Sequence, residues 1–224
     1  MQGKERTIMM GTSCRPSAMT EEQRIFEGRL FASEAPELVE KKRKAHRLSQ
    51  EFNNLFEEDE EARAAILRDL LGGIGDGTRM LGPIRFHYGC HTVIGSGCFM
   101  NFNFTVQDDA HVRIGDHCSF GPNCTIVTPQ HPLLPDERRG LACNDDEIRH
   151  VCYARPVTIG NDCWFGANVV VCPGVTIGDN CVVGAGSVVT RDLPRNSLAV
   201  GVPARVLREI TEADAIRNSF PDLR

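Results

Sequence analysis

Apolar residues recur at every sixth position between residues 159 and 189. They are Ile159, Phe165, Val171, Ile177, Val183 and Val189, and glycine follows at positions 160, 166, 178 and 184. An amphipathic helix repeats near every 3.6 residues and a half-buried strand near every two, so neither explains this spacing. Short strands joined by tight corners do explain it, as in a parallel β-helix whose coils stack on one another. The spacing therefore predicts a solenoid with apolar residues inside and glycines at its corners.

The same spacing continues toward the N-terminus with one change of register. The earlier positions are Ile94-Gly95, Met100 and Val106, then Ile114-Gly115, Phe120-Gly121 and Ile126. We expect the β-helix to occupy residues 77–201, with its sixes beginning at Tyr88. A polar segment, 129–155, interrupts them and is expected to protrude as a loop. Such a long loop within a regular solenoid is uncommon and usually functional.

Helical patterns come before the repeat. Thr20 and Gln23 form a capping-box pattern, Pro36 suits the first turn of a second helix, and a third helix is expected from Asp59 to Leu71. The positions expected to face inward include Ile25, Phe26, Leu30, Leu38, Leu48, Phe52, Ala62, Ala65, Ile66 and Leu70. We assign residues 19–76 to an α-helical N-terminal segment and residues 1–18 to a mobile extension. Residues 202–224 are assigned to a turn and a short C-terminal helix capped by Thr211.

Composition limits the possible functions. The 224 residues carry a net charge of −5, which argues against nucleic acid as a partner. No apolar run is long enough to span a membrane, and no signal peptide is visible in residues 1–20, so a cytoplasmic protein is expected. The basic run at 41–44 indicates a solvated helix face, with contact to substrate or phosphate as the alternative.

The ten cysteines do not require a disulfide framework. Half of them fall four positions after an apolar repeat position, where a small side chain fits the interior: Cys98, Cys118, Cys124, Cys163 and Cys181. We therefore expect reduced interior cysteines, with Cys163 and Cys181 stacked in successive coils.

Several further stretches point to a known family. They are Phe26–Phe31, Asn101–Thr105 with Asp108-Asp109, Gly121–Asn123, His131-Pro132, Ile159–Gly166, Pro173–Gly178, Gly184–Arg191 and Gly201–Arg205. In these stretches, and over residues 19–209 as a whole, the chain resembles the maltose and galactoside O-acetyltransferases, a branch of the hexapeptide-repeat acyltransferases. The resemblance implies a mainly β protein, a left-handed parallel β-helix. It also implies a homotrimer with active sites between subunits, acetyl-CoA as co-substrate, a sugar acceptor and no metal.

The chemistry implied by the resemblance is direct acetyl transfer in a ternary complex. A hydroxyl that attacks a thioester needs a base, and the resemblance gives this role to His131, since free imidazole titrates near pH 6.5. Attack creates an oxyanion that a positioned amide can stabilise, and Asn101 matches the family residue for transition-state and acceptor contacts. The alternative for Asn101 is a polar corner of the coil.

Other residues are expected to bind the two substrates. Asp109 matches an acceptor contact, and His87 and Ser33 stand where the galactoside branch has a serine and an acidic residue. These departures leave the acceptor open among maltose-, glucose- or galactoside-like sugars, an antibiotic and an amino acid. For the coenzyme, the resemblance implies Ala167, Ala185, Trp164, Thr190 and Arg191 along the groove. It also implies Arg205 and Arg208 at the phosphates, which guanidinium groups suit.

Three other interpretations are weaker. A zinc carbonic anhydrase of this fold needs three converging histidines, but His111 and His117 are six residues apart and Asp116 and Pro122 occupy comparable corners. A catalytically silent scaffold is disfavoured because His131 and Asn101 are both present. An acetyl-cysteine intermediate on Cys143 or Cys152 is disfavoured because nothing in the sequence places a base beside either thiol.

Overall fold

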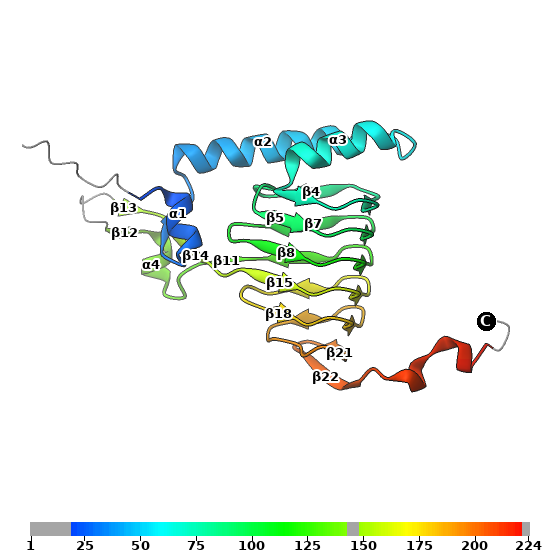
Figure 1. Cartoon of the computed structure of the whole chain (residues 1–224). Coiled ribbons are helices and arrows are strands. Elements are labelled where there is room, and N and C mark those ends of the chain that lie inside the picture. Colours follow the sequence, from blue (N-terminus) through cyan, green and yellow to red (C-terminus); the bar gives the residue numbers. More distant parts are fainter. Residues whose placement is uncertain (1–18, 143–147, 221–224) are drawn as a thin grey trace, which may run out of the picture.

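The computed structural model describes residues 19–142 and 148–220, so the expectation for residues 1–18 lies outside the described residues. The chain is a parallel β-solenoid. Figure 1 shows its coils stacked in one column, with helices α2 (Pro36–Asn53) and α3 (Glu60–Leu70) across one end and strands β21 (Ser197–Gly201) and β22 (Ala204–Glu209) at the other. The hand of the coil rests on the family resemblance.

Three parallel faces make up each coil. The first face contains β2 (Gly73–Ile74), β5 (Thr92–Ile94), β8 (Val112–Ile114), β15 (Val157–Ile159) and β18 (Thr176–Ile177). The second contains β3 (Arg79–Met80), β6 (Phe99–Met100), β9 (Ser119–Phe120), β16 (Trp164–Phe165), β19 (Val182–Val183) and β21, to which β22 adds antiparallel. The third contains β4 (Ile84–Phe86), β7 (Phe104–Gln107), β10 (Thr125–Val127), β17 (Val170–Val171) and β20 (Val188–Val189).

Two corners matter for the site. The asparagine corner joins the second face to the third. Its Asn103, Asn123 and Asn168 have positive φ angles and are linked by side-chain hydrogen bonds of 2.8 and 3.1 Å. Asparagine adopts this backbone conformation more readily than most residues, which explains its repeated use here. The loop corner joins the third face to the first face of the next coil, and segment 129–155 leaves the solenoid there.

The predicted interior is confirmed. All six repeat positions from Ile159 to Val189 are at most 2% exposed, and the rings of Phe120 and Phe165 stack with centroids 4.4 Å apart. The five predicted interior cysteines are buried and free. Cys163 and Cys181 directly precede the neighbouring strands β16 and β19, and Trp164 N donates to the carbonyl of Cys181 at 2.8 Å.

The solenoid begins earlier than expected. Its first strand is β2, ahead of both the residue-77 boundary and the predicted start of the sixes at Tyr88. The signal was present, because Ile74-Gly75, Met80 and Phe86 are spaced by six. An eight-residue step to Ile94 hides their continuity with the later repeats.

The three N-terminal helices form as predicted, with shifts in which residues they bury. Thr20 and Gln23 complete the capping box of α1 (Glu21–Phe26). Leu48, Phe52, Leu67 and Leu70, from α2 and α3, join the apolar core of the coil. The inward assignment of Phe26 and Leu30 was wrong, since they are 43% and 42% exposed.

The buried stripe of α3 is also displaced from the predicted one. Ala62 and Ala65 are exposed, and Arg63 is buried in their place. The Arg63 guanidinium lies 4.1 Å from the centre of the Phe52 ring and donates to the carbonyls of Met80 and Leu81 at 2.8 and 2.5 Å. Because carbonyl oxygens accept the hydrogen bonds of its guanidinium group, Arg63 can be buried on the face of α3 where the apolar pattern predicted alanine.

The described parts of segment 129–155, residues 129–142 and 148–155, form regular secondary structure. They contain β11 (Pro129–Gln130), α4 (Pro135–Arg139), β12 (Leu141–Ala142), β13 (Ile148–Arg149) and β14 (Val151–Ala154). Strand β14 pairs antiparallel with β11 and with β1 (Phe31–Ala32), so one small sheet ties the N-terminal segment to the excursion. Figure 1 shows this sheet and α1 beside the column of coils.

The C-terminal helix takes the form of two 3₁₀ turns, Glu212–Asp214 and Ile216–Asn218, and Thr211 caps the first as predicted. Among the described residues, no helix combines the length and apolar character needed to cross a membrane.

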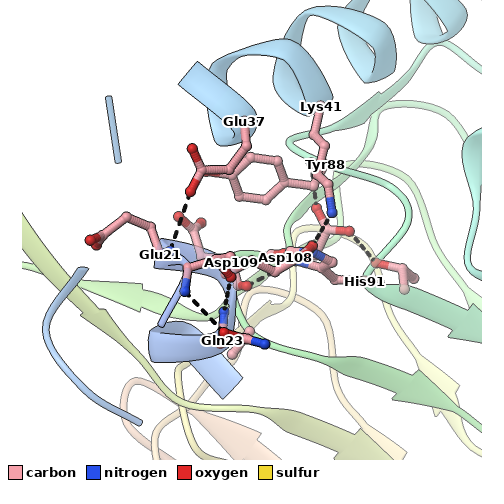
Figure 2. Close-up of polar contacts among 12 residues, drawn as sticks. Glu21, Gln23, Glu37, Lys41, Tyr88, His91, Asp108 and Asp109 are labelled. Carbon is pink, nitrogen blue, oxygen red and sulfur yellow. Dashed lines mark hydrogen bonds and ion pairs between the residues drawn. The ribbon is translucent and has the colours of Figure 1, made fainter. Parts of the chain in front are cut away.

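A polar network fixes α1 and α2 to the loop corner. Glu22 accepts a hydrogen bond from His91 Nε2 at 2.8 Å and forms an ion pair with Lys41 of α2. His91 Nδ1 lies 2.8 and 2.9 Å from the carbonyls of Asp108 and Asp109. Figure 2 shows these contacts around Lys41, His91, Asp108 and Asp109. Burial alone would lower the pKa of His91, but its hydrogen bonds to Cys90 and Glu22 and the charge of Asp108 raise it to about 9.

The fold should lose stability as the pH rises from about 6.5 to 9, because the folded chain keeps the His91 proton that the unfolded chain releases. We expect this group to contribute on the order of 1–3 kcal/mol to that loss. Urea unfolding at pH 6.5, 7.5 and 9 will measure it. His91→Gln should flatten the pH dependence and His117→Asn, at an exposed corner, should leave it unchanged. An equal slope in wild type and His91→Gln would contradict the assignment.

Candidate active site

A buried carboxylate marks the loop corner after β7. Asp109 is 3% exposed, and its Oδ2 has no hydrogen-bond partner among the described residues. Burial, with a further contribution from the charge of Asp108, raises the pKa of Asp109 to about 6. Asp108 differs because it accepts from Tyr88 N and Thr92 Oγ1, both at 2.8 Å. A buried oxygen without a partner is suited to receive a hydrogen bond from a ligand.

His87 faces this carboxylate from the end of β4. Its Nε2 lies 4.0 Å from Asp109 Oδ1, which is too far for a hydrogen bond. Burial and the positive charge of Lys42 lower the pKa of His87 to about 4. The imidazole is therefore neutral near pH 7 and offers one donor and one acceptor rather than a charge.

His131 lies directly after β11 at the same corner. It is exposed, its Nδ1 is 3.4 Å from Cys152 Sγ, and its Nε2 has no partner among the described residues. The small sheet explains the contact, because Gln130 pairs with Tyr153 and places the next residue, His131, beside Cys152. On the other side of β14, Cys152 pairs with Phe31, two residues before Ser33, and Ser33 acts to lower the pKa of the Cys152 thiol. The strand register therefore brings the predicted acceptor residue Ser33 to the same small sheet as His131.

This geometry corrects one expectation. Sequence reasoning found no base beside Cys152, whereas the structure places His131 there; Cys143 lies outside the described residues. Burial and the charge of Asp109 raise the pKa of Cys152, despite an opposing hydrogen bond from Ser33. The thiol is thus neutral, and the contact is not the thiolate–imidazolium pair that activates a nucleophilic cysteine.

Asn101 lies elsewhere, at the asparagine corner. Its Oδ1 accepts from the backbone N–H of Phe102 at 2.8 Å, as a polar corner residue would. Strand β7 lies between Asn101 and Asp109, and at about 3.3 Å per residue it separates them by more than about 13 Å. Within one chain, the two predicted acceptor contacts do not meet.

The predicted coenzyme residues are divided in the same way. Ala167 and Ala185 are neighbours at the asparagine corner, since Gly186 N donates to the Ala167 carbonyl at 2.8 Å. A side chain on Gly166 would meet the Ala185 backbone nitrogen at 2.6 Å, so the coils approach closely there. Trp164, on the second face, is 58% exposed. Thr190 and Arg191 instead follow β20 at the loop corner.

The two C-terminal arginines are exposed on β22. Arg205 donates to the Ala204 carbonyl at 2.8 Å. Arg208 donates to both carboxylate oxygens of Asp214, at 2.8 and 2.7 Å, so a phosphate would have to share or replace that pair.

Among the described residues, one group has the donor atoms of a metal site: Glu22, Cys90 and His91. Glu22 is already paired with Lys41, and His91 holds its proton at neutral pH. Within one chain, the histidines of the carbonic anhydrase interpretation lie in different surroundings. The ring of His111 stacks on Phe26 at 4.1 Å, whereas His117 occupies a positive-φ corner between the first and second faces.

Comparison with known proteins supports the resemblance. The profile "Maltose acetyltransferase hexapeptide capping motif" matches residues 24–75, and "Hexapeptide repeat of succinyl-transferase" matches residues 111–129 and 156–191. The chain is 39% identical to galactoside O-acetyltransferase of Escherichia coli K12 over 192 residues, which is 86% of this chain and 90% of that protein.

Solved structures agree. A maltose O-acetyltransferase from Clostridium difficile 630 is 37% identical with a TM-score of 0.80, covering 87% of this chain and all of that one. A galactoside acetyltransferase in complex with coenzyme A is 39% identical with a TM-score of 0.80, covering 88% and 94%. Identity of this extent, over the helices and the repeat together, means that the chain belongs to the maltose and galactoside O-acetyltransferase family and is an O-acetyltransferase of that type.

Proposed function

We propose that the enzyme transfers the acetyl group of acetyl-CoA to a hydroxyl of a maltose-, glucose- or galactoside-like sugar, with His131 as the general base. The observation that carries the proposal is the loop corner itself. There an exposed imidazole lies with Nδ1 beside Cys152 and Nε2 free, and the charge of the buried Asp109 carboxylate acts on the same Cys152 thiol, whose pKa it raises. Relatives named for galactoside and maltose acetylation support the acceptor class, and a coenzyme A complex among them supports the donor.

The site needs two subunits, which supports a homotrimer. Asn101, Ala167 and Ala185 lie at the asparagine corner, whereas His131, Asp109 and His87 lie at the loop corner. Placing the asparagine corner of one protomer against the loop corner of the next would unite them. This contact joins two different surfaces, and repeating it around a three-fold axis closes a ring with three equivalent sites.

In this site the acceptor hydroxyl gives its proton to His131 Nε2 as its oxygen attacks the thioester carbonyl carbon. The side-chain amide of Asn101 from the neighbouring protomer donates to the oxyanion that forms. When the tetrahedral species collapses, the carbon–sulfur bond breaks and the coenzyme A thiolate takes the proton from the imidazolium. Asp109 accepts hydrogen bonds from the sugar, and Ser33 and His87 line the acceptor side.

The coenzyme would lie along the groove between protomers. Ala167 and Ala185 leave room for the pantetheine chain, Trp164 forms part of the wall, and Thr190 and Arg191 lie further along. Arg205 and Arg208 offer guanidinium groups to the phosphates. Free interior cysteines fit a reducing compartment, and we propose the cytoplasm.

Removal of the base should abolish most turnover. We expect His131→Ala to lower kcat by about 10²–10⁴, the usual contribution of a positioned acid–base group, without weakening acetyl-CoA binding. Thiol released from acetyl-CoA in the presence of maltose, glucose or a galactoside measures the rate, and calorimetry measures binding. His117→Asn is the matched control. Retention of more than about a tenth of wild-type kcat would argue against His131 as the base.

Cys152 should tolerate a polar replacement. Because its neutral sulfur contacts Nδ1 and does not attack the thioester, Cys152→Ser should keep kcat within about threefold, a change of less than 1 kcal/mol. Mass spectrometry of the enzyme after exposure to acetyl-CoA alone should find no acetyl adduct. Loss of activity in Cys152→Ser, together with an acetylated wild type, would instead establish a covalent intermediate.

Acceptor binding should weaken in acid. As the pH falls through about 6, Asp109 gains a proton and its carboxylate loses acceptor capacity, so the KM for the sugar should rise. Initial rates at saturating acetyl-CoA between pH 5 and 8 will show this. Asp109→Asn should raise the KM at pH 8 and remove its acid dependence, and an unchanged acid limb in that variant would rule out Asp109 as the titrating group.

A further inference from the structure

A hollow of about 330 Å³, lined by both apolar and polar side chains, lies between α2 and the third face, beside His87. His46 and Ser49 line it from α2, and Arg85, His87, Thr105 and Gln107 line it from β4, β7 and the loop corner. In Figure 1, α2 and β4 stand at the end of the column opposite β21 and β22.

Two positively charged side chains without an ion-pair partner among the described residues, Lys42 and Arg85, lie near this hollow, and the charge of Lys42 also acts to lower the pKa of Asp109. Of the described residues that line it, none is Asp or Glu, although the chain has a net charge of −5. Lys42 stands one helical turn before His46. The side chains of Lys42 and Arg85 have neither a salt bridge nor a hydrogen bond to any described residue. By contrast, Lys41 pairs with Glu22 and Lys44 with Asp69.

This positive charge changes the pKa of the two histidines that line the hollow, His46 and His87. Their ring centroids are 6.0 Å apart. Burial and Lys42 lower the pKa of both, and Arg85 adds to the effect on His46. Both rings are therefore neutral near pH 7 and serve as hydrogen-bonding groups, while Lys42 and Arg85 supply the positive field. The acidic group that faces His87 is Asp109, which lies at the loop corner and not in the hollow.

A second observation indicates that a ligand fills the hollow. The hydroxyl of Ser49, a residue only 5% exposed, lines the hollow and has no hydrogen-bond partner among the described residues. A buried hydroxyl left without a partner is costly. A bound oxyanion would accept its hydrogen bond and would also pair with Arg85 and Lys42.

We propose that the hollow binds the phosphate or carboxylate group of an anionic acceptor, so that the substrate class is a sugar phosphate or a uronic acid. This inference rests on the proposed acetyl transfer to a sugar hydroxyl. His87 joins the two regions, since its Nε2 is 4.0 Å from Asp109 and its ring borders the hollow. A sugar held by Asp109 therefore extends its charged substituent toward Arg85. Coenzyme phosphates are the other source of such an anion, but Arg205 and Arg208 lie on β22, at the far end of the column.

The test compares glucose, glucose 6-phosphate and glucuronate as acceptors at pH 7.5. We expect kcat/KM for an anionic sugar to exceed that for glucose by about tenfold or more, as a charge-assisted hydrogen bond worth about 1.5 kcal/mol would give. Arg85→Gln and Lys42→Gln should each reduce this ratio by about fivefold or more. Arg43→Gln, an exposed neighbour on α2, is the matched control and should leave the ratio unchanged.

Equal use of glucose and its anionic relatives, or the same loss in Arg43→Gln as in Arg85→Gln, would overturn the proposal while leaving sugar acetylation standing. A raised KM for acetyl-CoA in Arg85→Gln, with the acceptor ratio unchanged, would assign the hollow to the coenzyme and equally overturn it. If no sugar is acetylated, calorimetry with glucose 6-phosphate decides separately. If glucose 6-phosphate binds to the wild type and to Arg43→Gln but not to Arg85→Gln, the anion site is supported although the proposed reaction has failed. If glucose 6-phosphate does not bind to the wild type, the anion site is rejected together with the proposed reaction.

Discussion

Stacking of apolar side chains inside the coil is the constraint on which the rest of the structure depends. Each coil has to place its inward residues on those of the coil below, and the parallel register carries this alignment through all three faces. Every corner therefore repeats at a fixed place along the column. Residues far apart in sequence, such as Ala167 and Ala185, become neighbours because they share a corner.

This constraint also explains why the candidate residues divide into two groups. A side chain at the asparagine corner cannot reach the loop corner of its own coil, because a strand of the third face separates them. In the proposed mechanism, catalysis therefore depends on contact between protomers, so activity would require assembly. On this proposal, a folded but isolated chain would carry all the chemical groups and no complete site.

The repeat made the solenoid predictable from the sequence, since sixes with glycine leave few alternatives. The interior cysteines and the capping box of Thr20 and Gln23 followed from local rules and are confirmed. Other features depended on tertiary partners. Arg63 is buried because its guanidinium group hydrogen-bonds to carbonyls of the first coil and packs on the Phe52 ring. The sequence of α3 alone does not predict these partners. The contact of His131 with Cys152 depends on the register between β11 and β14, in a segment without six-residue periodicity, so the repeat does not predict this pairing.

The small sheet of β1, β14 and β11 fixes the position of His131 independently of the outer part of segment 129–155. Its register holds His131 at the base of the excursion, while the antiparallel pair β12 and β13 lies further out along the chain. Residues inserted or deleted between β12 and β13 would not alter the pairing of β11 with β14. The connection between β12 and β13 is thus a place where the length of the chain can change at little cost to the position of the His131 imidazole.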